Sequence, residues 1–93
     1  MLDIKTVLSL DKRIVLRKIG NKYWAFDIEN GNQYRLNEVS YFILELFRNP
    51  LSVENAIVLV LKEYKVDRDC LVADCEKIWQ FALDKKILKE VIA

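Results

Sequence analysis

The segment from Lys22 to Asn37 constrains the fold most strongly, because it has the pattern of a β-hairpin that leads into a helix. In its first half, large apolar side chains occupy every second position, as is typical of a half-buried strand: Trp24, Phe26 and Ile28. Asn30-Gly31 is a strong turn signal, and the return strand is predicted from Asn32 to Leu36.

The hairpin register follows from matching the faces of the two strands, since a slip of one residue turns every side chain over. A three-residue loop, Glu29 to Gly31 with Gly31 in the left-handed conformation, gives one continuous apolar face. This register predicts Phe26 opposite Tyr34 and Trp24 opposite Leu36. The other edge of the return strand has no predicted neighbour, so it is either a blunted edge or a docking site for another strand.

The rest of the chain predicts a three-stranded meander followed by three helices. A first strand, Arg13 to Ile19, precedes the two-residue turn Gly20-Asn21. Each of the three expected helices has a polar N-cap and an apolar periodicity. The first starts after Asn37 or Ser40 and ends before Asn49-Pro50, and the second runs from Ser52 to about Tyr64 or Lys65. The third covers Cys70 to Lys85, with Asp67 or Asp69 as its cap. The segment 1–12 is left as an arm that packs on the core, and 86–91 as a short strand or tail.

The third predicted helix has an unusually wide apolar surface. Leu71, Cys75, Ile78 and Ala82 form its central stripe, while Val72, Trp79 and Leu83 widen the arc to about 140°, against the usual 100° or so. This pattern predicts two adjoining buried surfaces. The second surface either covers the hairpin or lines a groove beside the sheet.

Composition excludes several functional classes. The chain has 93 residues, enough for one domain, with 15 basic against 14 acidic residues and a net charge of +1, so no nucleic-acid or membrane partner is predicted. It contains no His and only two Gly, which removes most acid–base schemes, the commonest metal ligand and every glycine-rich phosphate loop. We therefore expect a protein that is not an enzyme and has no metal site or cofactor.

The two cysteines and the N-terminus carry no special signal. Cys70 and Cys75 are five residues apart on one predicted helix, point in different directions and fit no zinc spacing, so both are expected to be reduced. No apolar run approaches the roughly 18 residues that span a bilayer, and the N-terminus lacks a secretory signal pattern. A cytoplasmic location is expected.

Several short motifs, in this order and spacing, resemble the PqqD-like family, the RiPP precursor peptide recognition elements: Tyr34-Arg35-Leu36-Asn37, Ile43-Leu44-Glu45-Leu46, Glu63-Tyr64-Lys65-Val66, Asp74 and Ile87-Leu88. The resemblance covers about Ile14 to Val91. Two helix stops depart from the family pattern, with Asn49-Pro50 in place of Asp-Gly and Lys86 in place of Gly.

The resemblance implies an α+β fold of the winged helix-turn-helix type, in which a three-stranded antiparallel sheet is followed by a three-helix bundle. It also implies a leader peptide that adds as a strand to the third strand and lies against the third helix. The positions carried over for peptide binding are Gln33, Tyr34, Arg35, Leu36, Val72, Cys75, Glu76, Trp79 and Leu83. Asp74 lies off this arc, so a structural role is expected for it.

The partners implied by the resemblance are a precursor leader peptide and a leader peptidase or modifying enzyme of the same pathway. The short chain is most similar to the separate leader-binding proteins of lasso-peptide clusters, with PQQ-type and other clusters as alternatives. Two other hypotheses remain. One is a DNA-binding winged helix; the other is a structural subunit whose groove is filled by its own segment 1–12.

Overall fold

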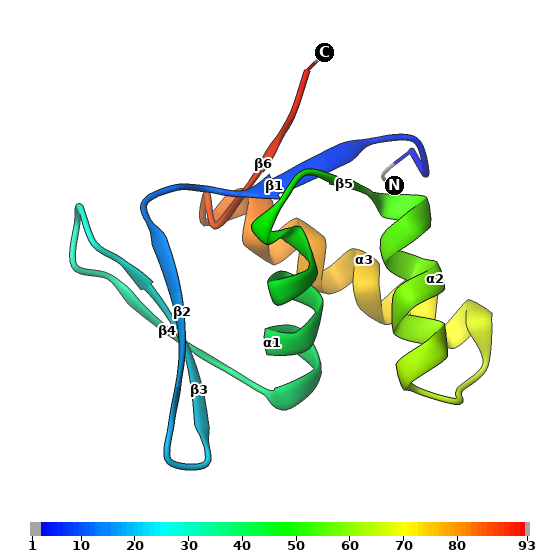
Figure 1. The fold of residues 1–93 in the computed structure, drawn as a ribbon, viewed down its shortest axis with the longest axis horizontal. Coiled ribbons are helices and arrows are strands. Elements are labelled where there is room, and N and C mark those ends of the chain that lie inside the picture. The colour runs from blue at the N-terminus through cyan, green and yellow to red at the C-terminus, as the bar shows by residue number, and fades with distance from the viewer. Residues whose placement is uncertain (1–2, 93) are drawn as a thin grey trace.

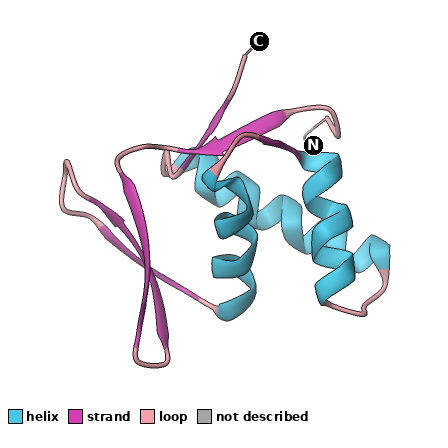
Figure 2. Cartoon of the chain, viewed as in Figure 1, coloured by secondary structure: helices cyan, strands magenta, loops and turns pink. Residues whose placement is uncertain are grey.

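The structure is a computed structural model that describes residues 3–92. Its described part contains two three-stranded antiparallel sheets and three α-helices, which confirms the α+β class. One sheet, formed by β2, β3 and β4, stands to the left of the helices in Figure 1, and the other, formed by β5, β1 and β6, runs across their upper ends. The helices pack together on the other side of the molecule (Figure 2).

The first sheet is the predicted meander. Its strands β2 (Ile14–Ile19), β3 (Lys22–Asp27) and β4 (Gln33–Leu36) pair in sequence order. Ile19 pairs with Lys22, so the first turn has the two residues Gly20-Asn21, as predicted, and Gly20 has a φ of 63°. Gly31 in the second turn has a φ of 78°, which agrees with its predicted left-handed conformation.

The predicted register of the second hairpin is wrong by one residue. The Asp27 amide donates to the Asn32 carbonyl (2.9 Å), and the ladder continues with Ala25 opposite Tyr34. The loop is therefore the four-residue segment 28–31, and neither predicted pair, Phe26 with Tyr34 or Trp24 with Leu36, is formed.

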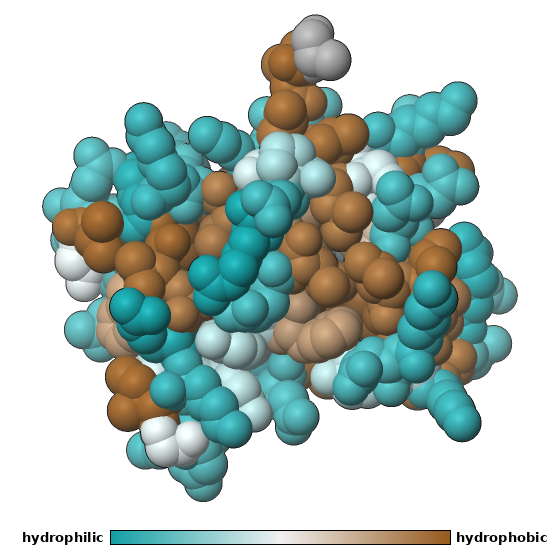
Figure 3. Space-filling view, viewed as in Figure 1, coloured by the Kyte–Doolittle hydropathy of each residue, from teal (hydrophilic) through white to brown (hydrophobic). Residues whose placement is uncertain are grey.

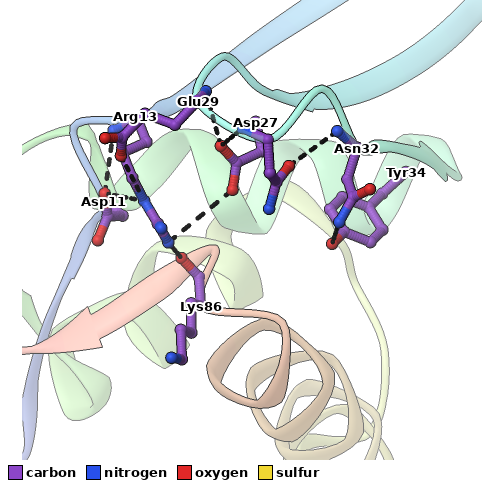
Figure 4. Close-up of polar contacts among 8 residues, drawn as sticks. Asp11, Arg13, Asp27, Glu29, Asn32, Tyr34 and Lys86 are labelled. Atoms are coloured by element: carbon purple, nitrogen blue, oxygen red, sulfur yellow. Dashed lines mark hydrogen bonds and ion pairs between the residues drawn. The ribbon is translucent and has the colours of Figure 1, made fainter.

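The cause of this register is the carboxylate of Asp27, which the alternation pattern had placed toward solvent. Only 2% of Asp27 is exposed, and its Oδ1 accepts the backbone amides of Glu29 (3.0 Å) and Asn30 (3.2 Å) (Figure 4). A buried carboxylate needs such donors to offset its lost hydration. Since Asp27 points inward, Trp24 and Phe26 lie on the outer face of the sheet.

Arg13 connects this turn to distant parts of the chain. Its guanidinium lies 3.9 Å from the Asp27 carboxylate and 3.1 Å from Asp11, and it donates to the Lys86 carbonyl (3.3 Å) (Figure 4). Backbone and side-chain hydrogen bonds from Arg13 lower the pKa of Asp11. The hairpin turn, the start of β2 and the end of the last helix therefore share one polar cluster.

The helices begin at the predicted caps. They are α1 (Glu38–Glu45), extended by a 3₁₀ turn (Leu46–Arg48), α2 (Val53–Glu63) and α3 (Arg68–Asp84). In each case a side-chain oxygen accepts an amide of the first turn, at 2.7 Å for Asn37, 3.1 Å for Ser52 and 3.3 Å for Asp67.

The second sheet was not predicted. It consists of β5 (Leu51–Ser52), β1 (Val7–Leu10) and β6 (Leu88–Glu90), with β1 in the centre. Leu8 of β1 is fully buried, so the described part of the arm belongs to the core rather than to the edge of β4. For residues 3–12, the hypothesis of an arm that fills the groove is therefore wrong; residues 1 and 2 lie outside the described part.

The end of α3 has an unfavourable residue at its left-handed position. Lys86 has a φ of 60°, and the Ile87 amide donates back to the Ala82 carbonyl (2.8 Å), a helix stop that usually employs Gly. A residue with a side chain pays about 1–2 kcal/mol to adopt this conformation. Gly avoids this strain, but it loses more backbone entropy on folding, which offsets part of the gain.

We predict that Lys86→Gly raises the free energy of unfolding by about 0.5–1 kcal/mol, measured by urea denaturation. The matched control is Lys85→Gly, one residue earlier at a φ of −87°, where Gly brings only its entropy cost and lowers stability. Equal effects at the two positions would contradict this explanation.

Candidate functional site

Strand β4 is an edge of its sheet and has an unpaired side. The sheet order is β2-β3-β4, and no strand of residues 3–92 pairs with the far side of β4. Asp27 and Asn32 form a hydrogen-bonded pair, and in an antiparallel ladder every second pair is hydrogen-bonded. The pair of Ala25 with Tyr34 is therefore hydrogen-bonded too, so the amide and carbonyl of Tyr34 point toward β3. The backbone groups of Gln33 and Arg35 therefore point outward, where another strand can bind.

A hollow of about 230 Å³ lies directly beside this edge. Residues of three elements line it: Arg35, Leu36 and Asn37 at the end of β4, Ser40 and Leu44 from α1, and Lys77, Ile78 and Phe81 from α3. Phe81 packs edge-on against Tyr34, with 6.0 Å between the ring centroids. The edge strand thus borders an apolar surface with one lysine, Lys77, at its helical side.

A second hollow of about 240 Å³ lies further along the same helix. It is lined by Val39 of α1, by residues of the α2–α3 connection, and by Cys70, Leu71 and Asp74 of α3. Positions 70, 74, 77, 78 and 81 recur at helical spacing, so together they mark one side of α3. We call this side, with the two hollows and the β4 edge, the groove.

A larger hollow, about 560 Å³, lies against a different face of α1. Its walls are aromatic, with Tyr23 and Tyr41 4.9 Å apart and Phe42 and Tyr64 5.6 Å apart between centroids. The ammonium of Lys18 already lies over the Tyr23 ring at 5.6 Å. This hollow does not border the open edge of β4.

Hydrophobic residues are exposed across the middle of the face drawn in Figure 3.

The four predicted strand residues lie on or at the end of β4, beside the hollow. Gln33 and Arg35 are exposed, Tyr34 is half-buried toward Phe81, and Leu36 is buried at the end of β4. The hydroxyl of Tyr34 accepts a hydrogen bond from the Asn32 amide group at 3.3 Å (Figure 4). These four positions lie together at one end of the groove.

The predicted helix residues lie elsewhere. Cys75 and Trp79 are 0% exposed, and Trp79 packs edge-on against Phe47 at 6.3 Å, so neither lines a surface hollow in this structure. Val72, Glu76 and Leu83 are half-buried and lie beside this buried stripe, outside both hollows. The α3 residues that line the hollow beside β4 are instead Lys77, Ile78 and Phe81.

The second sheet accounts for the burial of Cys75 and Trp79. Strand β6 packs against α3, and buried Ile87 and Leu88 join the same core as Trp79. The wide apolar arc of α3 therefore faces one core on both of its sides. The sequence signal for the groove side is Phe81, a large apolar residue outside the predicted arc, which is 39% exposed in the structure. Asp74, for which a structural role is expected, borders the second hollow.

The two cysteines lie in different environments. Both are free, Cys70 is exposed and Cys75 is buried. Burial raises the pKa of the Cys75 thiol to about 11, and a hydrogen bond with Asp67 raises that of Cys70. In residues 3–92, no three His, Cys, Asp or Glu side chains gather as a metal site, and no helix is long and apolar enough to cross a bilayer.

Comparison with known proteins identifies the family. The model of the PqqD family, described as coenzyme PQQ synthesis protein D, matches residues 22–88. The chain belongs to the PqqD family. The match extends from the start of β3 into β6, so it includes the open edge of β4 and all of α3.

A solved structure has the same fold as this PqqD-family chain. It is described as TbiB1 in complex with the TbiA(beta) leader peptide, and it superposes with a TM-score of 0.76 over 91% of this chain and 99% of that chain. The two sequences are 19% identical, so the comparison concerns the fold. No curated protein matches the chain.

We predict that the two sides of α3 respond differently to truncation. Trp79→Ala removes a fully buried indole and should lower the free energy of unfolding by about 3–5 kcal/mol, whereas Phe81→Ala should cost only about 0.5–1.5 kcal/mol. Urea denaturation of both variants measures the difference. If Phe81→Ala proves as costly as Trp79→Ala, Phe81 belongs to the core and the groove is misplaced.

Proposed function

We propose that this protein binds the leader segment of a ribosomally made precursor peptide by β-strand addition to β4. The observation that carries the proposal is an unpaired strand edge that borders an apolar hollow, because an edge supplies backbone hydrogen bonds and the hollow supplies side-chain contacts. Membership of the PqqD family and likeness in fold to TbiB1, whose structure includes a leader peptide, support it.

In the proposed complex, the leader forms a fourth strand next to β4. The amides and carbonyls of Gln33 and Arg35 pair with its backbone. Every second leader side chain then faces inward, toward Tyr34, Leu36 and the groove side of α3. Of the other positions predicted for peptide binding, Cys75 and Trp79 belong to the core, Val72 and Leu83 pack against it, and Glu76 is half-buried beside them. In the proposed complex these five residues hold α3 in place, and the leader contacts the groove side.

The proposed role is non-catalytic. The protein holds the leader in a winged-helix-like scaffold and presents the precursor to a leader peptidase or modifying enzyme. The resemblance in sequence to the separate leader-binding proteins of lasso-peptide clusters makes such a pathway the first to test. A short precursor gene next to genes for a peptidase and a cyclase would support that assignment.

DNA binding gains no support from α3. A recognition helix exposes a basic surface to the major groove, whereas the segment 67–86 carries five acidic and four basic residues. Its apolar stripe is also buried, at Leu71, Cys75, Trp79 and Ala82. We therefore do not propose a nucleic-acid partner.

Proline substitutions on β4 test strand addition. Arg35→Pro removes an amide that points to the open edge, so the protein should fold but bind its leader less tightly than Arg35→Ala, by about 1–3 kcal/mol. Tyr34→Pro removes an amide that β3 uses and should destabilise the fold. Leader titration by calorimetry, with a synthetic peptide from the precursor gene beside this gene, and thermal melts measure the two effects.

Arg35→Ala is the control that removes the side chain and keeps the backbone donor. If Arg35→Pro folds and binds the leader as tightly as Arg35→Ala, the Arg35 amide makes no bond to the peptide, and strand addition at this position is wrong.

A further inference from the structure

The outer face of the first sheet carries an aligned row of side chains that ends at the open edge. The register pairs Arg17 of β2 with Trp24 of β3, and Trp24 with Arg35 of β4. The Arg35 guanidinium lies 5.6 Å from the centroid of the Trp24 ring. Arg35 is thus the last member of the row, and a strand added to β4 would place its next residue directly beside it.

The guanidinium of Arg35 is positioned but has no anionic partner. The ion pairs found in residues 3–92 involve Arg13 and Arg48, and Arg35 takes part in none of them. Stacking on an indole uses the face of a guanidinium and leaves its N–H donors, which lie in the plane, available for a carboxylate. An exposed arginine held in this way is suited to bind an acidic side chain.

The surroundings of Arg35 favour the same ligand. The outer face consists of the alternate residues of the three strands, and those that are charged are all basic: Arg17, Lys22 and Arg35. Of the two acidic residues of this hairpin, Asp27 points to the inner face and is buried, and Glu29 lies in the loop, 3.5 Å from the Arg13 guanidinium. A like-charged residue beside Arg35 would be repelled, whereas a carboxylate there would meet no competing anion on the face.

We propose that this protein selects leader peptides with an acidic residue at the position beside Arg35. This inference rests on the proposed strand addition and adds to it the chemistry of the recognised sequence. The two neighbours of that acidic residue point to the inner face, beside Tyr34 and Leu36, where Phe81 and Ile78 line the hollow. The recognised tripeptide is therefore apolar–acidic–apolar.

The test is a selection from a displayed library of random peptides, each long enough to cover β4. Wild-type protein should enrich peptides with an acidic residue between two apolar ones. In a selected peptide made synthetically, acid-to-amide replacement should weaken binding about two- to fivefold, the size expected of an exposed ion pair, and high salt should reduce this difference. Arg35→Glu should enrich a basic residue at the same position.

A charge-reversal variant outside the groove and a neutral variant at Arg35 serve as matched controls. Arg17→Glu changes the same row two strands away, roughly 10 Å from β4, and should leave the selected tripeptide unchanged. Arg35→Gln, which avoids a new charge over Trp24, should remove the acidic preference without creating a basic one.

The outcomes separate the inference from the proposed function. If wild-type protein selects peptides that Arg35→Pro no longer binds, but without an acidic preference, strand addition stands and the role of Arg35 is wrong. Acidic enrichment that survives Arg35→Glu, or that disappears with Arg17→Glu, also overturns it. If wild-type protein selects no peptide at all, both the inference and the proposed function fail.

Discussion

The buried carboxylate of Asp27 is the interaction on which the arrangement of the site depends. It accepts two amides of the loop that follows it and lies close to Arg13, so turning Asp27 outward would break both hydrogen bonds and separate it from the guanidinium. This fixes the four-residue loop and hence the register of β4. A slip of one residue would point the amides of Gln33 and Arg35 into the sheet and move Arg35 out of the row with Trp24.

The same cluster sets the edge of β4 relative to α3. Arg13 bonds to Asp11 before β2, approaches the hairpin loop at Asp27, and donates to the Lys86 carbonyl where α3 ends. Lys86 adopts a left-handed conformation at the end of α3. Strand β6 follows and pairs with β1 in the second sheet, which packs against α3. The groove is thus formed between an edge strand and a helix that share one polar anchor, while the second sheet keeps Trp79 and Cys75 in the core.

Local chemistry in the sequence was sufficient to predict the parts of this fold that depend on neighbouring residues. Asn37, Ser52 and Asp67 cap the three helices, Gly20 and Gly31 lie in turns, and β4 is an edge. The register was missed because the alternation of polar and apolar residues predicts that Asp27 faces solvent. No local pattern reveals that Asp27 is buried by contacts with two loop amides and with Arg13. The second sheet was missed because β1 pairs with segments more than forty residues away, at Leu51 and Leu88. Without that sheet, the burial of Cys75 and Trp79 in the core could not be predicted.

Amide hydrogen exchange on β4, resolved by NMR, tests the central claim most directly. In the free protein, the amides of Gln33 and Arg35 should exchange quickly because they face solvent, and the Tyr34 amide should be protected by β3. A bound leader should slow exchange at Gln33 and Arg35 and leave Tyr34 protected as before. If the leader binds and the exchange of Gln33 and Arg35 does not change, the peptide does not add to this edge and the account is contradicted.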